Sequence, residues 1–241
     1  MGRDFEPGDK RESMLKQRLF PILTAVCLLI GSVPIFAQEV PPPTLGDFDP
    51  ASLEGIDPAD FPIIPLLTDH ARAIFERGQA LETPRDPHMF SKVGDSMTAS
   101  VNFLTAFGDG EGAYDLGDYP ELEPTVAFFN ASTDADGHNA FNRENFANSL
   151  GFSTASALDS TWAVQGACEP NENPLACEYR ASNSAFALIM FGTNDVMVFD
   201  AMLFDFFLRQ GIVETMAADV VPVLYTMPIR PEAPDQSRVF N

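Results

Sequence analysis

Hydrophobic and polar positions follow two patterns along this chain, and the two patterns predict different elements. Residues 185–191 form a continuous apolar run and residues 220–226 a nearly continuous one, which is typical of strands covered on both faces. A third short strand is predicted over residues 88–93. Residues 146–158 combine a strand-like piece with the start of a helix. Apolar residues at helical spacing predict further helices over residues 66–80, 97–107, 122–130 and 198–218.

Strands that alternate with helices predict βαβ crossovers and an α/β fold with a doubly wound parallel sheet. In such a sheet, ligands and catalytic groups lie at the carboxyl ends of the strands. Two polar turns have this position, because Gly94-Asp95-Ser96 and Gly192-Thr193-Asn194-Asp195 each follow a predicted strand. We therefore expect the two turns at the same edge of one sheet.

The amino-terminal segment has the composition of a secretory signal peptide. Lys16 and Arg18 precede an apolar stretch that ends in the small residue Ala37, after which we expect cleavage. Residues 1–13 would be an upstream extension, with Met14 as an alternative start. An uncleaved membrane anchor is the alternative to a cleaved leader, because the apolar stretch has nearly the length of a transmembrane helix.

We divide the chain into a signal peptide (1–37), a linker rich in proline and acidic residues (38–60) and one folded domain (61–241). The leader predicts a secreted protein, extracellular or periplasmic. An oxidising compartment in turn predicts a disulfide between Cys168 and Cys177, the two cysteines outside the leader. Two cysteines without a nearby histidine make a poor metal site, so we expect no metal there.

Acidic side chains outnumber basic ones by 35 to 14, which gives a formal net charge of -21. Removal of residues 1–37 would take away five basic and four acidic side chains and leave about -22. A field of this sign repels phosphate backbones and anionic lipid surfaces. We therefore expect a monomer with no nucleic-acid partner, and a membrane contact only through an uncleaved leader.

Ser96 and Asn194 are the candidate catalytic residues. A serine at a strand-to-helix turn has its hydroxyl exposed beside a helix N-terminus, as a nucleophile requires. An asparagine amide held by a glycine turn on a neighbouring strand can donate to the oxyanion of a tetrahedral intermediate. The alternative for Gly94-Asp95-Ser96 is a simple capping turn, since Asp and Ser are both good N-caps, but the presence of the second motif argues against it.

The two motifs, each closing an apolar strand, resemble those of the SGNH hydrolases, also called GDSL-type esterases and lipases, over about residues 60–241. The resemblance implies a flavodoxin-like sheet, Ser96 as nucleophile, Asp95 as a supporting residue that orders the turn, and Asn194 as oxyanion donor. A further block of that family supplies a backbone N–H from a glycine. Thr154 stands where this glycine is expected, and Gly151 is the alternative donor.

The general base of that family is a histidine in an Asp-x-x-His block near the carboxyl terminus, and no histidine follows Asp195 here. The chain has His70, His88 and His138, none of them preceded by an aspartate three residues earlier. We expect that the chain is truncated before this block and before the family's last helix. A natural relative without catalysis is the alternative, and replacement of the base by His138 is a weaker one. This chain is therefore predicted to be inactive as it stands.

The sequence thus predicts a secreted serine hydrolase that cleaves carboxylic esters of a lipid or an acetylated carbohydrate. No metal or organic cofactor is expected. The hypothesis from a different class is a catalytically inactive extracellular binding module on the same scaffold. The substrate, a small molecule or a polysaccharide, would be selected by loops such as residues 108–145.

Overall fold

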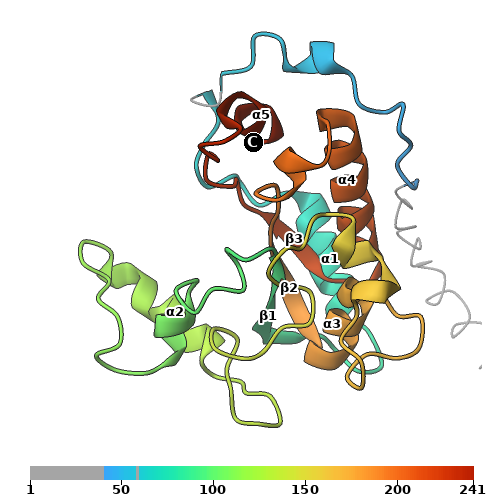
Figure 1. Ribbon diagram of the computed structural model, residues 1–241. Helices are drawn as coiled ribbons and strands as arrows, with labels where there is room; N and C mark the ends of the chain where they lie inside the picture. Colours follow the sequence, from blue (N-terminus) through green and yellow to red (C-terminus); the bar gives the residue numbers. More distant parts are fainter. Residues whose placement is uncertain (1–40, 58–59) are drawn as a thin grey trace, which may run out of the picture. The chain divides into compact units, whose positions relative to one another are not determined.

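The computed structural model describes residues 41–57 and 60–241, which form an α/β fold around a parallel sheet (Figure 1). Both pairs of neighbouring strands run parallel. The predicted α/β class, with a parallel sheet flanked by helices, is confirmed, and the arrangement is compatible with a flavodoxin-like fold. The predicted leader lies outside the described residues. Across the sheet, the order of the strands is β1 (Asp86–Gly94), β2 (Ser184–Met190) and β3 (Val221–Leu224).

Three of the predicted helices, those over residues 66–80, 122–130 and 198–218, are confirmed as α1, α2 and α4. The α-helices of the described residues are α1 (Asp69–Gln79), α2 (Glu123–Phe129), α3 (Pro174–Ser182), α4 (Ala201–Ala217) and α5 (Pro234–Phe240). Short 3-10 helices lie at Pro50–Leu53, Thr105–Gly108, Pro120–Leu122, Ser156–Leu158, Ser160–Trp162 and Asp195–Met197.

Polar side chains cap the three longest helices. The side chains of Thr68, Asn173 and Asp200 accept backbone N–H groups in the first turns of α1, α3 and α4. Each cap satisfies an N–H that has no partner within its helix. These helices therefore begin where the sequence supplies a side-chain acceptor.

Helices cover both faces of the sheet, which explains the continuous apolar run in β2. Ile189 lies in a cluster with Tyr179 of α3 and Phe204 of α4. Phe186, whose side chain points to the opposite face, stacks on Phe75 of α1 and lies edge-on to Phe129 of α2. Successive residues of a strand point to opposite faces, so a strand buried on both faces needs apolar residues at every position.

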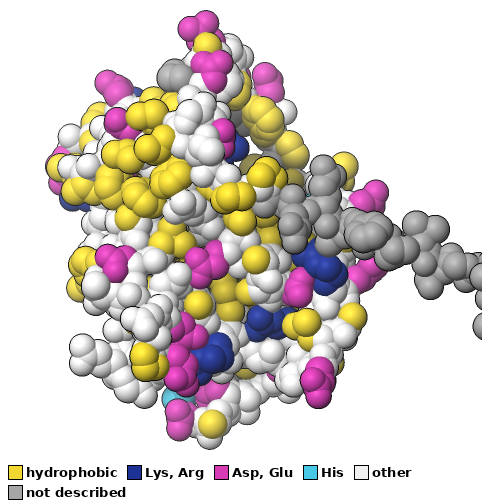
Figure 2. All heavy atoms as spheres, turned by 90° about the vertical axis from the view of Figure 1, so that its right-hand side faces the viewer, with side chains coloured by type: hydrophobic (Ala, Val, Ile, Leu, Met, Phe, Trp, Pro, Cys, Tyr) yellow, Lys and Arg dark blue, Asp and Glu magenta, His cyan; other side chains and the backbone are white. Residues whose placement is uncertain are grey.

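The apolar residues of α4 occur on all sides of the helix, but only Phe204 and Thr215 are buried. Figure 2 looks onto the side of Figure 1 on which α4 lies, and hydrophobic side chains gather in the upper half of this view. Met202 of α4 is 41% exposed. Most of the other residues of α4 are partly buried. Within the same described ranges, no helix combines the length and the apolar character needed to cross a membrane.

The predicted helix over residues 97–107 is wrong, because the chain forms turns there and a 3-10 helix only from Thr105. The Oδ1 atom of Asp95 accepts the Met97 N–H at 2.8 Å, and the Asp95 carbonyl accepts the Thr98 hydroxyl at 3.0 Å. Such local bonds offer the backbone an alternative to a helix. Leu104 then has a φ of 62°, which a helix does not allow.

The prediction for residues 146–158 is also largely wrong. The segment makes a single β-bridge, between Asn148 and Gly94, and its helical part is limited to short 3-10 turns. The apolar pattern misses two helices. It does not predict α3, because the segment between the cysteines has the composition of a loop, and it does not predict the seven-residue α5. Cys168 and Cys177 form the predicted disulfide, which joins the loop before α3 to that helix.

Candidate active site

The turn after β1 leaves Ser96 free. Gly94 has a φ of 154°, and a Cβ at this position would overlap the carbonyl oxygen of Met190, so only glycine fits. Asp95 is buried and its Oδ1 holds the Met97 N–H. Ser96 is partly exposed, and no described residue hydrogen-bonds to its hydroxyl or its N–H. The turn therefore presents an unengaged hydroxyl.

The turn after β2 is held by a hydrogen bond within the turn and by a hydrogen bond to another segment. Gly192 has a φ of 124°, and a Cβ there would overlap the sulfur of Met227. Asp195 is fully buried, and its Oδ2 accepts the Gly192 N–H at 3.1 Å. Asn194 is partly exposed, and one of its two amide hydrogens goes to the Phe152 carbonyl at 2.8 Å. Its second amide hydrogen has no acceptor among the described residues.

A third segment, residues 147–154, connects the two turns. The Gly94 N–H donates to the Ala147 carbonyl at 3.0 Å, and the Gly94 carbonyl accepts the Ser149 N–H at 3.4 Å. At the other end of the segment, Thr154 donates both its N–H and its hydroxyl to Asp195 Oδ1, at 2.8 and 2.6 Å. The structure thus brings the segments that carry Ser96, Asn194 and Thr154 together, by hydrogen bonds between residues far apart in the sequence.

The position of this third segment makes the carboxyl end of β1 a topological switch point. Gly94 pairs with Met190 of β2 and with Asn148 of the third segment, so the two partners lie on opposite sides of β1. After β1, the chain first runs along one side of this strand as the third segment and later crosses to its other side as β2. Open α/β sheets bind ligands in the crevice at such a point.

The candidate oxyanion donors differ in their availability. The N–H of Thr154 is already taken by Asp195. Gly151 is exposed, with a φ of 82°, and its N–H has no acceptor among the described residues. Within the described residues, the N–H of Ser96, the N–H of Gly151 and the second amide hydrogen of Asn194 are therefore free to donate.

Both aspartates of the two turns have shifted pKa values. Burial raises the pKa of the Asp95 carboxyl, and the Met97 N–H, the polar groups of Thr193 and the charge of Arg230 oppose this shift. Burial likewise raises the pKa of Asp195, against the hydrogen bonds from Thr154. The cause is the cost of placing a charge in a medium of low polarity.

Arg230 is the cation of this edge that the sequence does not single out. Its guanidinium donates to the carbonyl oxygen of Thr193, next to Asn194, and lies 3.4 Å from the Glu232 carboxylate. The signal that could have identified it is an arginine in the loop that follows β3. Arg230 fastens the turn after β2 to that loop.

None of the three histidines has a contact with Ser96. His70 is exposed on α1, and His138 is exposed in a turn, 3.8 Å from Asp134. His88 lies near the start of β1, with Nδ1 at 2.8 Å from the Phe128 carbonyl. At about 3.3 Å per residue, His88 is roughly 20 Å along the strand from Gly94. No described histidine contacts Ser96.

Potential metal ligands come together at one place in the described part of the chain, where Cys168, Glu172 and Cys177 meet. Both sulfurs there belong to the disulfide. The grouping therefore offers one carboxylate and no thiolate, which does not suit a metal ion.

Comparison of this chain with protein-family models, with curated proteins and with solved structures finds no match. The case for an activity therefore depends on the geometry at the carboxyl edge of the sheet.

Proposed function

We propose that this protein is a serine hydrolase of the GDSL/SGNH type that cleaves carboxylic esters. The observation that carries the proposal is the free hydroxyl of Ser96 at a switch point, beside a turn whose Asn194 amide retains a free hydrogen. The N–H of Ser96 itself is a further unengaged donor. Donors of this kind, held in place before reaction, stabilise the oxyanion of acyl transfer.

In the proposed reaction, Ser96 Oγ attacks the ester carbonyl carbon and loses its proton to a base. The carbonyl oxygen becomes an oxyanion that accepts hydrogen bonds from the Asn194 amide and the Ser96 N–H. Collapse of the intermediate breaks the ester C–O bond, and the alcohol leaves with the proton that the base had taken. Water then attacks the acyl group on Ser96, which releases the carboxylic acid and returns a proton to Ser96 Oγ. No described histidine contacts Ser96, so this reaction needs a base other than the residues that contact Ser96.

Chemical rescue tests the proposal on this chain. A fluorophosphonate probe is incubated with the protein with and without high concentrations of imidazole, and the labelled site is identified by mass spectrometry. We expect negligible labelling without imidazole and labelling of Ser96 that increases with imidazole, because a free base can take the proton of a partly exposed hydroxyl.

Two variants control this experiment. Ser96→Ala should abolish the labelling while changing the free energy of unfolding by less than about 0.5 kcal/mol, since Ser96 makes no hydrogen bond in the described chain. Asn194→Ala should slow labelling by about 100-fold or more, as the loss of an oxyanion donor does. Folded protein that stays unlabelled at every imidazole concentration would contradict the proposal.

The absence of a histidine beside Ser96 among the described residues favours a second candidate function, a binding module that uses the scaffold without catalysis. This candidate predicts no rescue by imidazole. It also predicts that the ligand, for example a carbohydrate, raises the melting temperature of Ser96→Ala as much as that of the unmodified protein.

A further inference from the structure

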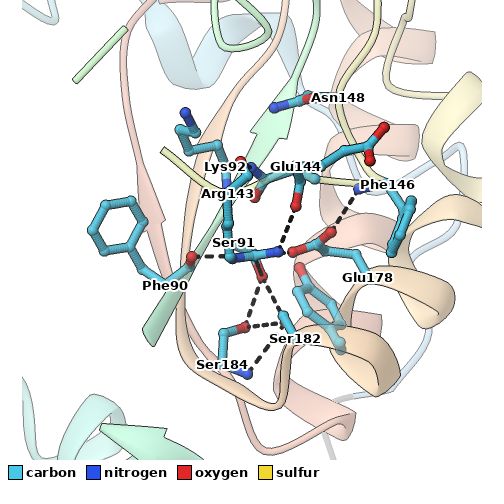
Figure 3. A network of polar contacts seen from close by, with 12 residues as sticks. Phe90, Ser91, Lys92, Arg143, Glu144, Phe146, Asn148, Glu178, Ser182 and Ser184 are labelled. Carbon is cyan, nitrogen blue, oxygen red and sulfur yellow. Dashed lines mark hydrogen bonds and ion pairs between the residues drawn. The ribbon is translucent and has the colours of Figure 1, made fainter. Parts of the chain in front are cut away.

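A buried cluster of charged groups lies against β1, away from the carboxyl edge (Figure 3). Arg143 and Glu178 form an ion pair in which the two residues are only 5% and 0% exposed. Glu178 comes from α3, whereas Arg143 lies in the irregular chain ahead of the third segment. Burial of such a pair costs desolvation energy, and apolar residues of the same volume are often equally stabilising. Stability alone therefore does not explain why this ion pair is buried here.

The ion pair holds main-chain groups on both sides. The Arg143 guanidinium donates to the Phe90 carbonyl at 3.2 Å and to the Ser91 hydroxyl at 3.1 Å, both in β1. The second carboxylate oxygen of Glu178 accepts the Phe146 N–H at 2.7 Å. One ion pair thus joins α3, β1 and the residue directly before the third segment.

Neighbouring side chains extend this attachment along β1. Asn145 accepts the Lys92 N–H at 2.8 Å and donates to the Arg143 carbonyl at 2.9 Å. Lys92, also buried, donates from Nζ to the Phe141 carbonyl at 2.9 Å. Side chains make these contacts in the place where a neighbouring strand would use its backbone. Residues 141–146 therefore lie on the outer edge of β1 without being a strand.

The contacts of residues 141–146 with β1 determine which of the following residues lie at the carboxyl edge of the sheet. Directly after Phe146, backbone pairing begins between Ala147, Ser149 and Gly94. The chain then turns, and the Phe152 carbonyl meets the Asn194 amide. A shift of one residue at the edge of β1 would exchange the faces to which these side chains point.

We propose that Arg143 and Glu178 are positioning residues for the candidate oxyanion donors: they set the register of residues 145–152 on β1, and so hold the Phe152 carbonyl against the Asn194 amide. This inference deepens the proposed function and rests on it. The two residues touch no substrate, and they act through the third segment.

The variant Glu178→Gln tests this role. A glutamine places an NH2 group against either the Arg143 guanidinium or the Phe146 N–H, so one donor loses its acceptor. Glu172→Gln is the matched control, because it removes the partner of Arg180 of the same helix, in a more exposed ion pair that does not touch the third segment. Both variants lose one negative charge.

Two measurements are made on both variants and on the unmodified protein. The first is imidazole-dependent labelling of Ser96, which we expect to slow by about 10- to 100-fold in Glu178→Gln and not in Glu172→Gln. The second is hydrogen exchange, which should become faster in residues 145–152 of Glu178→Gln while the amides of β2 keep their protection. Labelling at the unmodified rate, or unchanged exchange in this segment, would overturn the inference.

Failure of the inference differs from failure of the proposed function. If the unmodified protein is never labelled, the proposed function is wrong, and the exchange measurement alone then decides whether the pair sets the register. If Glu178→Gln does not fold, the double variant Arg143→Met with Glu178→Leu keeps the volume and removes both charges. A folded double variant with unchanged exchange in residues 145–152 would also overturn the inference.

Discussion

The turns after β1 and β2 occupy equivalent places at one edge of the sheet, and each contains a buried aspartate, yet the two aspartates are bonded differently. Both oxygens of Asp195 accept hydrogen bonds, from Gly192 in its own turn and from Thr154 in the third segment. The Asp95 carboxylate has one such bond, from the Met97 N–H to Oδ1, and its buried Oδ2 has none, although the polar groups of Thr193 act on this carboxylate. Asp195 fastens two segments together by hydrogen bonds, whereas the hydrogen bond of the Asp95 carboxylate stays within its own turn.

Under the proposed function, this difference assigns a separate task to each turn. The turn after β2 is fixed in space by bonds to other segments, so the Asn194 amide has a defined direction. The turn after β1 keeps the Ser96 hydroxyl and N–H free. The proposed acyl transfer would use this arrangement, in which preorganised donors lie beside an unengaged hydroxyl. The same substitution made at matching positions of the two turns should therefore have unequal effects.

The largest effect is expected at the two glycines. Gly94→Ala should lower the free energy of unfolding by about 3 kcal/mol, because its Cβ meets a backbone carbonyl of the neighbouring strand. Gly192→Ala should cost about 1–2 kcal/mol, because its Cβ meets the flexible end of Met227. Urea denaturation measures both. Gly151→Ala is the control for positive φ without a clash, and equal losses at Gly94 and Gly192 would refute the difference.

A smaller effect is expected for the two aspartates. Asp195→Asn should destabilise the fold by about 2–3 kcal/mol, because its amide group must face either the Gly192 N–H or the Thr154 donors. Asp95→Asn should cost less than about 1 kcal/mol, because the NH2 group can take the position of the unbonded Oδ2. The two variants are compared by thermal unfolding, and a greater loss in Asp95→Asn would reverse the assignment of roles.

The smallest effect concerns the pH dependence of stability. Burial raises the pKa of Asp95 in the folded chain, so its contribution to stability is fully present below the unfolded pKa, about 3.9, and is lost as the pH rises through the folded value. The stability of the unmodified protein relative to Asp95→Asn should therefore decrease from about pH 3.5 upward. Urea denaturation over this pH range measures the difference, and a constant difference would show that the pKa is not raised.

Several elements could be predicted from the sequence because local patterns determine them. The apolar run of β2 and the cap at Thr68 are each visible within a few residues of the chain. The helix over 97–107 could not be excluded in this way, because the bonds of Asp95 that replace it depend on the turn conformation. The start of α3 at Asn173-Pro174 has a capping signal, but the disulfide loop around it has the composition of a turn.

The sequence by itself determined the strands, most of the helices, the disulfide and the two glycine turns, because periodicity, caps and turn residues act over short distances. Only the tertiary structure decided which donors stay free. The N–H of Thr154 belongs to Asp195, 41 residues away, and the third segment is held by a pair, Arg143 and Glu178, that is 35 residues apart. Such contacts form when the chain packs and buried polar groups must find partners, and no local pattern records them.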